Sequence, residues 1–338
     1  MYHKRIVVDF DDTLAFHENR NFDDAVPNDD LIKKTNQLFD EGWQIDIFTA
    51  RGSISCKTRE EARLKYEAGI VAWLDKYDVQ YNSLSFDKPL AAYYIDDKGI
   101  TPEAFLDVDI RELEGGLSGT EIFTDGKVVH KQDSNAHDTN TWFNEAFFVG
   151  INVPIIHRIV GETITMDYID HDEQFFMKDF HVALGMIQTQ LQRMKGLEAL
   201  DELKYQSYIN RIKDHAVASG QVELINNADV LETFDLKRSF SHGDFGIKNM
   251  LFKDHELYLI DPICNVFGCT ELDVAKFCAS LYINQYHKEY ILKSIDILAA
   301  ANDINKPMLL ALIRAEITRV YKYHPDKSFI MECFENVY

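Results

Sequence analysis

The chain has 338 residues, 46% of them hydrophobic and 27% charged, a balance typical of globular proteins with one large domain or two smaller ones. Its formal net charge is −21, and both halves are acidic, which argues against a nucleic-acid partner. No apolar run is long enough to cross a membrane, the start lacks a signal-peptide pattern, and the five cysteines form no CxxC pair, so we expect a cytoplasmic protein with free thiols and no membrane partner.

The first predicted element is the apolar run RIVVDF at residues 5–10, which favours a central strand of a parallel sheet, buried on both faces. Asp9, Asp11 and Asp12 lie at its end, where ligands of such sheets bind. Asp9 and Asp11 can share one side of the extended chain while Asp12 points away. Two converging carboxylates call for a hard cation such as Mg²⁺. A helix cap or a strand-end acidic turn is the alternative interpretation.

Two more strand ends carry polar side chains. The run GWQIDIFTARG predicts a second strand that ends at Thr49. The run FDKPLAAYYIDDKG holds Lys88 and a third apolar stretch that ends at Asp96 and Asp97. Helical patterns occupy most of the intervals between these runs, so no large lid domain fits there. The site at these strand ends should therefore be open, unless another domain or subunit covers it.

These four parts in this order resemble the haloacid dehalogenase-like (HAD) phosphatases over about residues 4–112. The segments TARG and KP…YIDD are most similar to those of the small phosphatases of capsular polysaccharide gene clusters. The resemblance implies an α/β fold class for residues 1–112, a Rossmann-like HAD domain with a parallel sheet and no large cap.

The resemblance also implies roles for individual residues. Asp9 becomes the nucleophile, Asp11 the general acid and then base, and Thr49 and Lys88 bind the phosphoryl group. The implied Mg²⁺ ligands are Asp9, Asp11, Asp96 and Asp97. Asp12 is expected to be solvated or to cap a turn. For Arg51, contact with the substrate and a surface salt bridge both stay open.

The second half begins with EGGLSG, which fits a linker or a nucleotide-binding loop, followed by two strand-like runs around TDG, a hairpin turn. Lys131 lies at the end of the second run, and Glu145 lies in the predicted helix TNTWFNEAFFVG. GETITMDYID predicts a strand that leads into a hinge, and the helical runs HVALGMIQTQLQRM and DELKYQSYINRIKDHAVA come next.

Two segments near residues 239–265 carry the clearest motif of this half. SFSHGDFGIKNMLF and ELYLIDPICN contain Asp244, Asn249 and Asp261 in an order that resembles the aminoglycoside phosphotransferase and choline kinase family over about residues 113–330. The resemblance implies that residues 113–338 form a bilobal protein-kinase-like (α+β) domain that uses ATP and Mg²⁺.

The implied roles follow the chemistry of phosphoryl transfer, which needs positioning and charge neutralisation. Asp244 would accept the proton of the substrate hydroxyl, and Asn249 and Asp261 would hold Mg²⁺. Lys131, paired with Glu145, would contact the phosphates of ATP. The backbone near Met166 and Tyr168 would contact its adenine ring.

Three neighbours of these residues have weaker assignments. His242 and Asp273 are expected to brace the catalytic loop, and Lys248 fits a solvated lysine better than a phosphate ligand. The chain lacks a GxxxxGK[ST] motif, which removes a P-loop kinase, and its lack of an activation-loop arrangement argues against a protein kinase.

The sequence therefore predicts a multifunctional enzyme: a Mg²⁺-dependent phosphatase fused to an ATP-dependent kinase, acting on sugars, polyols or their phosphates, in the synthesis of a surface polysaccharide. Two alternatives stay open, a kinase for a cationic alcohol such as choline or an aminoglycoside, and a regulatory protein with one inactive domain. The substrate, the position phosphorylated, the nucleotide preference and the oligomeric state are left open by the sequence.

Overall fold

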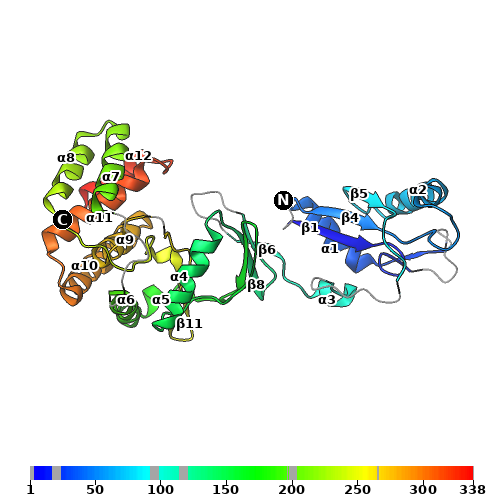
Figure 1. The fold of residues 1–338 in the computed structure, drawn as a ribbon, viewed down its shortest axis with the longest axis horizontal. Helices are drawn as coiled ribbons and strands as arrows, with labels where there is room; N and C mark the ends of the chain where they lie inside the picture. Colours follow the sequence, from blue (N-terminus) through cyan, green and yellow to red (C-terminus); the bar gives the residue numbers. More distant parts are fainter. Residues whose placement is uncertain are drawn as a thin grey trace. The chain divides into compact units, whose positions relative to one another are not determined.

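The computed structural model describes residues 4–16, 24–91, 99–113, 121–195, 197, 204–264 and 266–337. The chain divides into two compact units (Figure 1), which are Met1–Ile110 (unit 1) and Arg111–Tyr338 (unit 2). All five cysteines are free, as the sequence predicts. None of the helices in the described ranges is both long and apolar enough to cross a bilayer.

Unit 1 contains a parallel sheet with the strand order β1-β4-β5. Its strands are β1 (Arg5–Asp9), β4 (Gln44–Phe48) and β5 (Ser83–Ser85). Asp9 is in register with Phe48, and Phe48 with Ser85, so the carboxyl ends of all three strands lie at one edge. The short polar strand β5 was not predicted, and the apolar run at 92–98 lies outside the described residues. The expected burial of β1 on both faces is wrong for Val7, which is 56% exposed.

The other elements of unit 1 are β2 (Ala15–Phe16), β3 (Val26–Pro27), α1 (Asp29–Asp40), α2 (Arg59–Lys76) and α3 (Pro102–Leu106). Asn28 and Thr58 cap the two long helices by accepting a hydrogen bond from a first-turn amide, which explains where these helices begin. Lys34 of α1 donates to three carbonyl oxygens at and beyond the end of α3, which ties α3 to α1.

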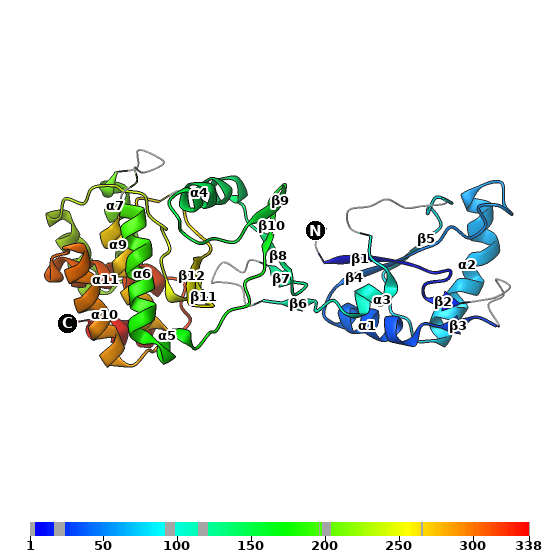
Figure 2. The same ribbon diagram turned by 90° about the horizontal axis from the view of Figure 1, so that it is seen from below.

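Unit 2 begins with an antiparallel sheet in the order β6-β7-β8-β10-β9. Its strands are β6 (Arg111–Glu112), β7 (Ile122–Thr124), β8 (Val128–Gln132), β9 (Ile156–Val160) and β10 (Thr163–Asp167). The predicted hairpin at TDG is confirmed: Asp125 accepts the amides of Lys127 and Val128, and Gly126 has a positive φ of 85°. Helix α4 (Ala136–Phe148) lies beside this sheet in Figures 1 and 2.

The rest of unit 2 is mostly helical (Figure 2). It comprises α5 (Phe175–Lys178), α6 (Phe180–Lys195), α7 (Tyr205–Ser219), α8 (Val222–Val230), α9 (Thr270–Ile283), α10 (Lys288–Asn302), α11 (Lys306–Tyr321), α12 (Lys327–Glu335) and the hairpin of β11 (Met250–Lys253) and β12 (Glu256–Leu259). Helix α9 is buried on almost every face and packs on α11. A continuous apolar core runs from the sheet through these helices. It supports the loop between α8 and β11, which carries His242, Gly243 and Asp244 and is called the HGD loop below.

Candidate active sites

The HGD loop of unit 2 is held by its own buried side chains. His242 is fully buried, accepts a hydrogen bond from the Asp244 amide at Nδ1 (3.3 Å), and lies 2.9 Å from the Ile260 carbonyl at Nε2. These partners fit a neutral ring with its proton on Nε2. Burial lowers the pKa of His242 to about 4. His242 is therefore a brace of the loop, as expected, and not an acid or base.

Gly243 allows the loop to pass close to the segment after β12. Its φ is +75°, and a Cβ atom at this position would lie 2.0 Å from the Ile263 carbonyl oxygen. Asp273 of α9 accepts the amides of His242 (2.9 Å) and Gly243 (3.2 Å), although burial raises the pKa of its carboxyl to about 7. Asp273 therefore braces the loop in the way that the sequence predicts.

The β11–β12 hairpin brings Asn249 and Asp261 together. Met250 pairs with Leu259, so Asn249 precedes one strand and Asp261 follows the other at the open end of the hairpin. The Ile260 amide donates to the Asn249 carbonyl at 3.1 Å. The Asn249 side-chain nitrogen donates to the Asp244 carboxylate (3.0 Å), which leaves its amide oxygen for a cation. One amide oxygen and one carboxylate suit a Mg²⁺ that also binds phosphate oxygens.

Lys131 of β8 lies at the same place. Its Nζ forms an ion pair with Asp261, and it lies 3.6 Å from an Oδ2 atom of Asp133. The predicted pair with Glu145 is not formed: Glu145 lies on an exposed position of α4. The buried face of α4 presents residues such as Thr139, which donates to Asp133 at 2.9 Å. Asp133 thus takes the position beside the lysine that the sequence analysis gave to Glu145.

Two cations face the Asp244 carboxylate. Arg319 of α11 donates to its Oδ1 at 3.1 Å, and Lys276 of α9 lies 3.6 Å from the same atom. Burial alone would raise the pKa of Asp244, but these two cations outweigh it and the pKa is lowered. The carboxylate is therefore ionised at neutral pH and can accept a proton. Lys248 is exposed, in agreement with its expected solvated state.

The predicted hinge follows β10. Met166 pairs with Val129 of β8 and is buried. The Tyr168 amide donates to the Lys127 carbonyl at 2.9 Å, and its hydroxyl accepts from Arg111 at 2.7 Å. The Tyr168 amide is thus bonded within the protein and is not open to an adenine ring in this structure. The glycine-rich segment before the sheet, residues 114–120, lies outside the described residues.

Unit 1 brings together two of its predicted residues at the end of β1. The Lys88 ammonium donates to Asp9 Oδ2 at 2.5 Å, and the Phe10 amide donates to Asp9 Oδ1 at 3.0 Å. Burial raises the pKa of Asp9, and Lys88 partly offsets this effect. The carboxylate next to a lysine, at the carboxyl end of a parallel strand, suits attack on a phosphoryl group whose charge the lysine offsets.

Asp11 lies beside this pair and has two partners of its own. The Thr49 hydroxyl donates to Asp11 Oδ2 (2.9 Å), and Arg51 donates to Oδ1 from Nε (2.9 Å). Arg51 thus forms a salt bridge, as one of the two interpretations expected, but not at the surface, since only 4% of its side chain is exposed. Thr49, also fully buried, holds Asp11 in this structure. Asp12 is exposed, with a positive φ of 60°, as its solvated role requires.

Asp96 and Asp97, the other expected Mg²⁺ ligands, lie outside the described residues. Among the residues that are described, no three His, Cys, Asp or Glu side chains form a metal-binding group. Any cation in unit 1 would rest on Asp9 and Asp11 together with ligands from elsewhere.

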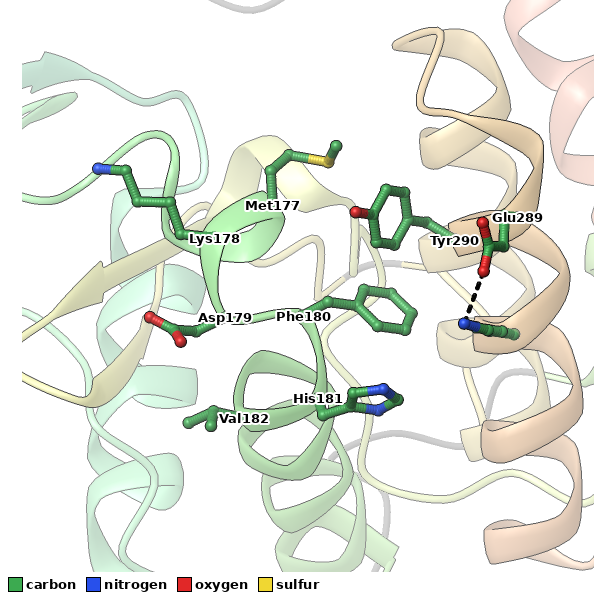
Figure 3. Close-up of a pocket in the computed structure, with 9 residues that line it drawn as sticks. Met177, Lys178, Asp179, Phe180, His181, Val182, Glu289 and Tyr290 are labelled. Atoms are coloured by element: carbon green, nitrogen blue, oxygen red, sulfur yellow. Dashed lines mark hydrogen bonds and ion pairs between the residues drawn. The ribbon is translucent and has the colours of Figure 1, made fainter.

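A pocket of about 370 Å³ lies between the start of α6 and helix α10 (Figure 3). Its lining residues are Met177, Lys178, Asp179, Phe180, His181, Val182, Glu289, Tyr290 and Lys293. Figure 3 shows the Phe180 and Tyr290 rings at its centre, and none of the predicted site residues lines it. The lysines that line it are paired, Lys178 with Asp172 and Lys293 with Glu289.

Four residues of the two sites were missed or left undecided by the sequence analysis: Arg51, Asp133, Lys276 and Arg319. Arg51 lies two positions after the predicted residue Thr49 in the segment TARG, and this proximity was the sequence signal for it. Arg319 lies 75 positions from Asp244, and no local pattern marks it.

No family model matches the chain, and no curated protein matches it in sequence. Solved structures do match. A choline/ethanolamine kinase family protein from Mesorhizobium loti is 11% identical, with a TM-score of 0.51 over 68% of this chain and 86% of its own. A thermostable mutant of an aminoglycoside phosphotransferase is 14% identical, with a TM-score of 0.52 over 70% of this chain and 96% of its own. About two thirds of the chain therefore has a kinase-like fold.

A protein from Vibrio cholerae is 26% identical over 31% of this chain and 89% of its own, with a TM-score of 0.28. This score is too low to assign a fold, so the HAD-like nature of unit 1 stays a prediction.

Proposed function

We propose that unit 2 is an ATP- and Mg²⁺-dependent kinase that phosphorylates a hydroxyl group of a small molecule. The observation that carries the proposal is the convergence of Lys131, Asn249, Asp261 and Asp244 from the sheet, the HGD loop and the β11–β12 hairpin. The kinase-like fold supports it, because both structural neighbours named above are described as kinases or phosphotransferases of small molecules.

In this reaction Asp244 accepts the proton of the acceptor hydroxyl. The hydroxyl oxygen forms a bond to the γ-phosphorus of ATP, the bond from that phosphorus to the bridging oxygen breaks, and ADP leaves. Asn249 and Asp261 would hold Mg²⁺, which offsets the charge of the phosphates. Lys131 offsets further phosphate charge once ATP separates it from Asp261.

The test is a screen of sugars, polyols and their phosphates that follows ADP release. Asp244→Asn should lower turnover about 10²-fold or more, as expected when a general base is removed, while ATP still binds. Unchanged turnover in this variant would contradict the assignment of the base.

We also propose that unit 1 is a Mg²⁺-dependent phosphatase, on the ion pair of Lys88 with Asp9 and the adjacent cluster of Asp11, Thr49 and Arg51. Asp9 would attack the phosphorus of a phosphate ester, and the ester oxygen would leave as an alcohol with a proton from Asp11. Water would then hydrolyse the aspartyl-phosphate and give its proton to Asp11. Mg²⁺, held by Asp9, Asp11 and the undescribed Asp96 and Asp97, would offset the charge.

The two units would act on one metabolite or on successive intermediates, since a kinase and a phosphatase for the same hydroxyl would only hydrolyse ATP. We infer sugar or polyol phosphates as substrates, and surface-polysaccharide synthesis as the setting, from the resemblance of TARG and KP…YIDD. Following phosphorus positions by NMR tests this: phosphate should move between positions without steady loss of ATP. Removal of the phosphate that the kinase has just added would contradict it.

A further inference from the structure

Arg319 places a cation at the catalytic base in a chain whose net charge is −21. Its side chain is 25% exposed, that of Asp244 is 33% exposed, and the Lys276 ammonium lies 3.6 Å from the same carboxylate oxygen. We infer that the acceptor of the kinase is an anionic alcohol, whose hydroxyl meets Asp244 while its phosphate or carboxylate group binds Arg319. This inference rests on the proposed kinase activity.

A buried glutamate, Glu316, fixes the orientation of the Arg319 side chain. Its Nε donates to Glu316 Oε2 at 3.0 Å, and Glu316, which is almost completely buried, accepts a second hydrogen bond from Tyr208 at 2.8 Å. Glu316 and Arg319 are three positions apart on α11, so they share one face of the helix. The guanidinium is therefore held in one plane before any substrate binds.

The outer edge of this guanidinium can still bind a ligand. Nη2 donates one hydrogen bond to Asp244, and within the described part of the chain Nη1 makes none. A guanidinium presents its N–H groups in a planar fork that matches the oxygens of a phosphate or carboxylate. Because Arg319 contacts Asp244 directly, an anion bound to Arg319 would lie close to the base. The acceptor hydroxyl would therefore sit on a carbon atom near the anionic group of the same molecule.

A cationic acceptor meets the opposite situation. An amine or quaternary ammonium group near Asp244 would face Arg319 and Lys276 at short range, where like charges repel strongly in a partly buried site. The structure therefore disfavours choline and aminoglycosides, the cationic alternative left open by the sequence. An anionic acceptor is instead attracted by Arg319, the more exposed of the two cations, since the buried Lys276 also donates to the Gly243 carbonyl.

A different role for Arg319 is simple neutralisation of the Asp244 charge. That role predicts an equal effect on every acceptor, because the base would change for all of them. An anion site predicts an effect on the KM of anionic acceptors alone. The two roles are separated by comparing acceptors that differ only in one anionic group.

The experiment uses the full chain with Asp9→Asn, so that unit 1 does not remove phosphate from the probes. Matched sets supply the acceptors: glycerol, glycerol 3-phosphate and glycerate; glucose, glucose 6-phosphate and gluconate; and choline as the cation. ADP release gives kcat and KM. We expect kcat/KM for at least one anionic acceptor to exceed that for the neutral alcohol of the same set at least tenfold. Comparison of the phosphate with the carboxylate in each set shows which anion the site prefers.

Arg319→Gln should then raise the KM for that anionic acceptor at least tenfold, with a smaller rise for Arg319→Lys, which keeps the charge and loses the fork. The matched control is Lys306→Gln, which removes a positive charge from the first turn of the same helix, about 20 Å away at 1.5 Å per residue. The control should leave KM unchanged. Stabilisation by Mg²⁺·ATP in a thermal melt shows that each variant is folded.

Two results would overturn the inference while the kinase stands: transfer to neutral alcohols or choline that is as efficient as transfer to the anionic members, or an equal loss on all acceptors in Arg319→Gln. Failure of the wild-type chain to bind Mg²⁺·ATP would instead contradict the proposed function itself.

Discussion

Lys131 and Asp261 form an ion pair although 130 positions separate them in the chain. Lys131 is the second-last residue of β8, and Asp261 follows the β11–β12 hairpin, with a positive φ of 60° that few residues other than glycine adopt. In the proposed reaction one residue contacts phosphate and the other holds Mg²⁺. Without nucleotide they offset each other's charge, so the site is assembled before ATP arrives.

The neighbour that positions Lys131 can be identified by mutation. Asp133→Asn removes the carboxylate 3.6 Å from Nζ, and we expect the KM for ATP to rise about fivefold to tenfold, because a charge next to the phosphate-binding lysine is lost. Glu145→Gln is the matched control on α4 and should stay within twofold of wild type. Steady-state kinetics with varied ATP measures both. A large rise in the KM for ATP in Glu145→Gln alone would instead support Glu145 as the partner of Lys131.

The role of His242 can be tested through pH. Burial lowers the pKa of His242 to about 4, below its ordinary 6.5, so the neutral ring stabilises the fold above pH 6.5 and this stabilisation is lost as pH falls toward 4. His242→Gln keeps an N–H donor for the Ile260 carbonyl and does not titrate.

Between pH 7.5 and pH 5, wild type should therefore lose roughly 2 kcal/mol more unfolding free energy than His242→Gln, from about 1.4 kcal/mol per pKa unit. Urea unfolding at the two pH values measures the difference. A loss of equal size in both proteins would show that folding does not lower the pKa of His242.

The independence of the two units gives a third prediction. Asp9→Asn should abolish phosphate release from phosphate esters, because an amide is a poor nucleophile, and should leave ATP-dependent transfer intact. Lys88→Met should also impair phosphate release, since the partner of Asp9 is lost. Phosphate and ADP assays on the same samples measure both activities. Loss of transfer with retained phosphate release would reverse the assignment of the units.

Local patterns predicted the parts of the fold that depend on neighbouring residues. The Asp-Gly turn at 125–126 and the strands around it follow from turn chemistry, and the HGD and IDP segments place Asp244, Asn249 and Asp261 on one hairpin and its adjoining loop. Strand β5 was missed because SLS is short and polar, without the apolar alternation that marks a strand.

The partners of the site residues could not be predicted in the same way. Arg319 reaches Asp244 from α11, and Asp133 replaces Glu145 because α4 turns a face of small and aromatic residues toward the core. Both outcomes depend on how helices pack, which no short segment encodes. The same holds for Arg51, whose burial against Asp11 follows from the fold of the loop after β4.

Transfer of labelled phosphate tests the central claim most directly. The full chain with Asp9→Asn is incubated with Mg²⁺, ATP labelled at the γ-phosphate, and a mixture of small neutral and anionic alcohols, and the same is done with Asp9→Asn/Asp244→Asn. We predict that label enters an alcohol with the first protein and at least about 10² times more slowly with the second, because the general base is absent. Equal transfer by both proteins, or no transfer by the first, would contradict the account of unit 2 as a small-molecule kinase.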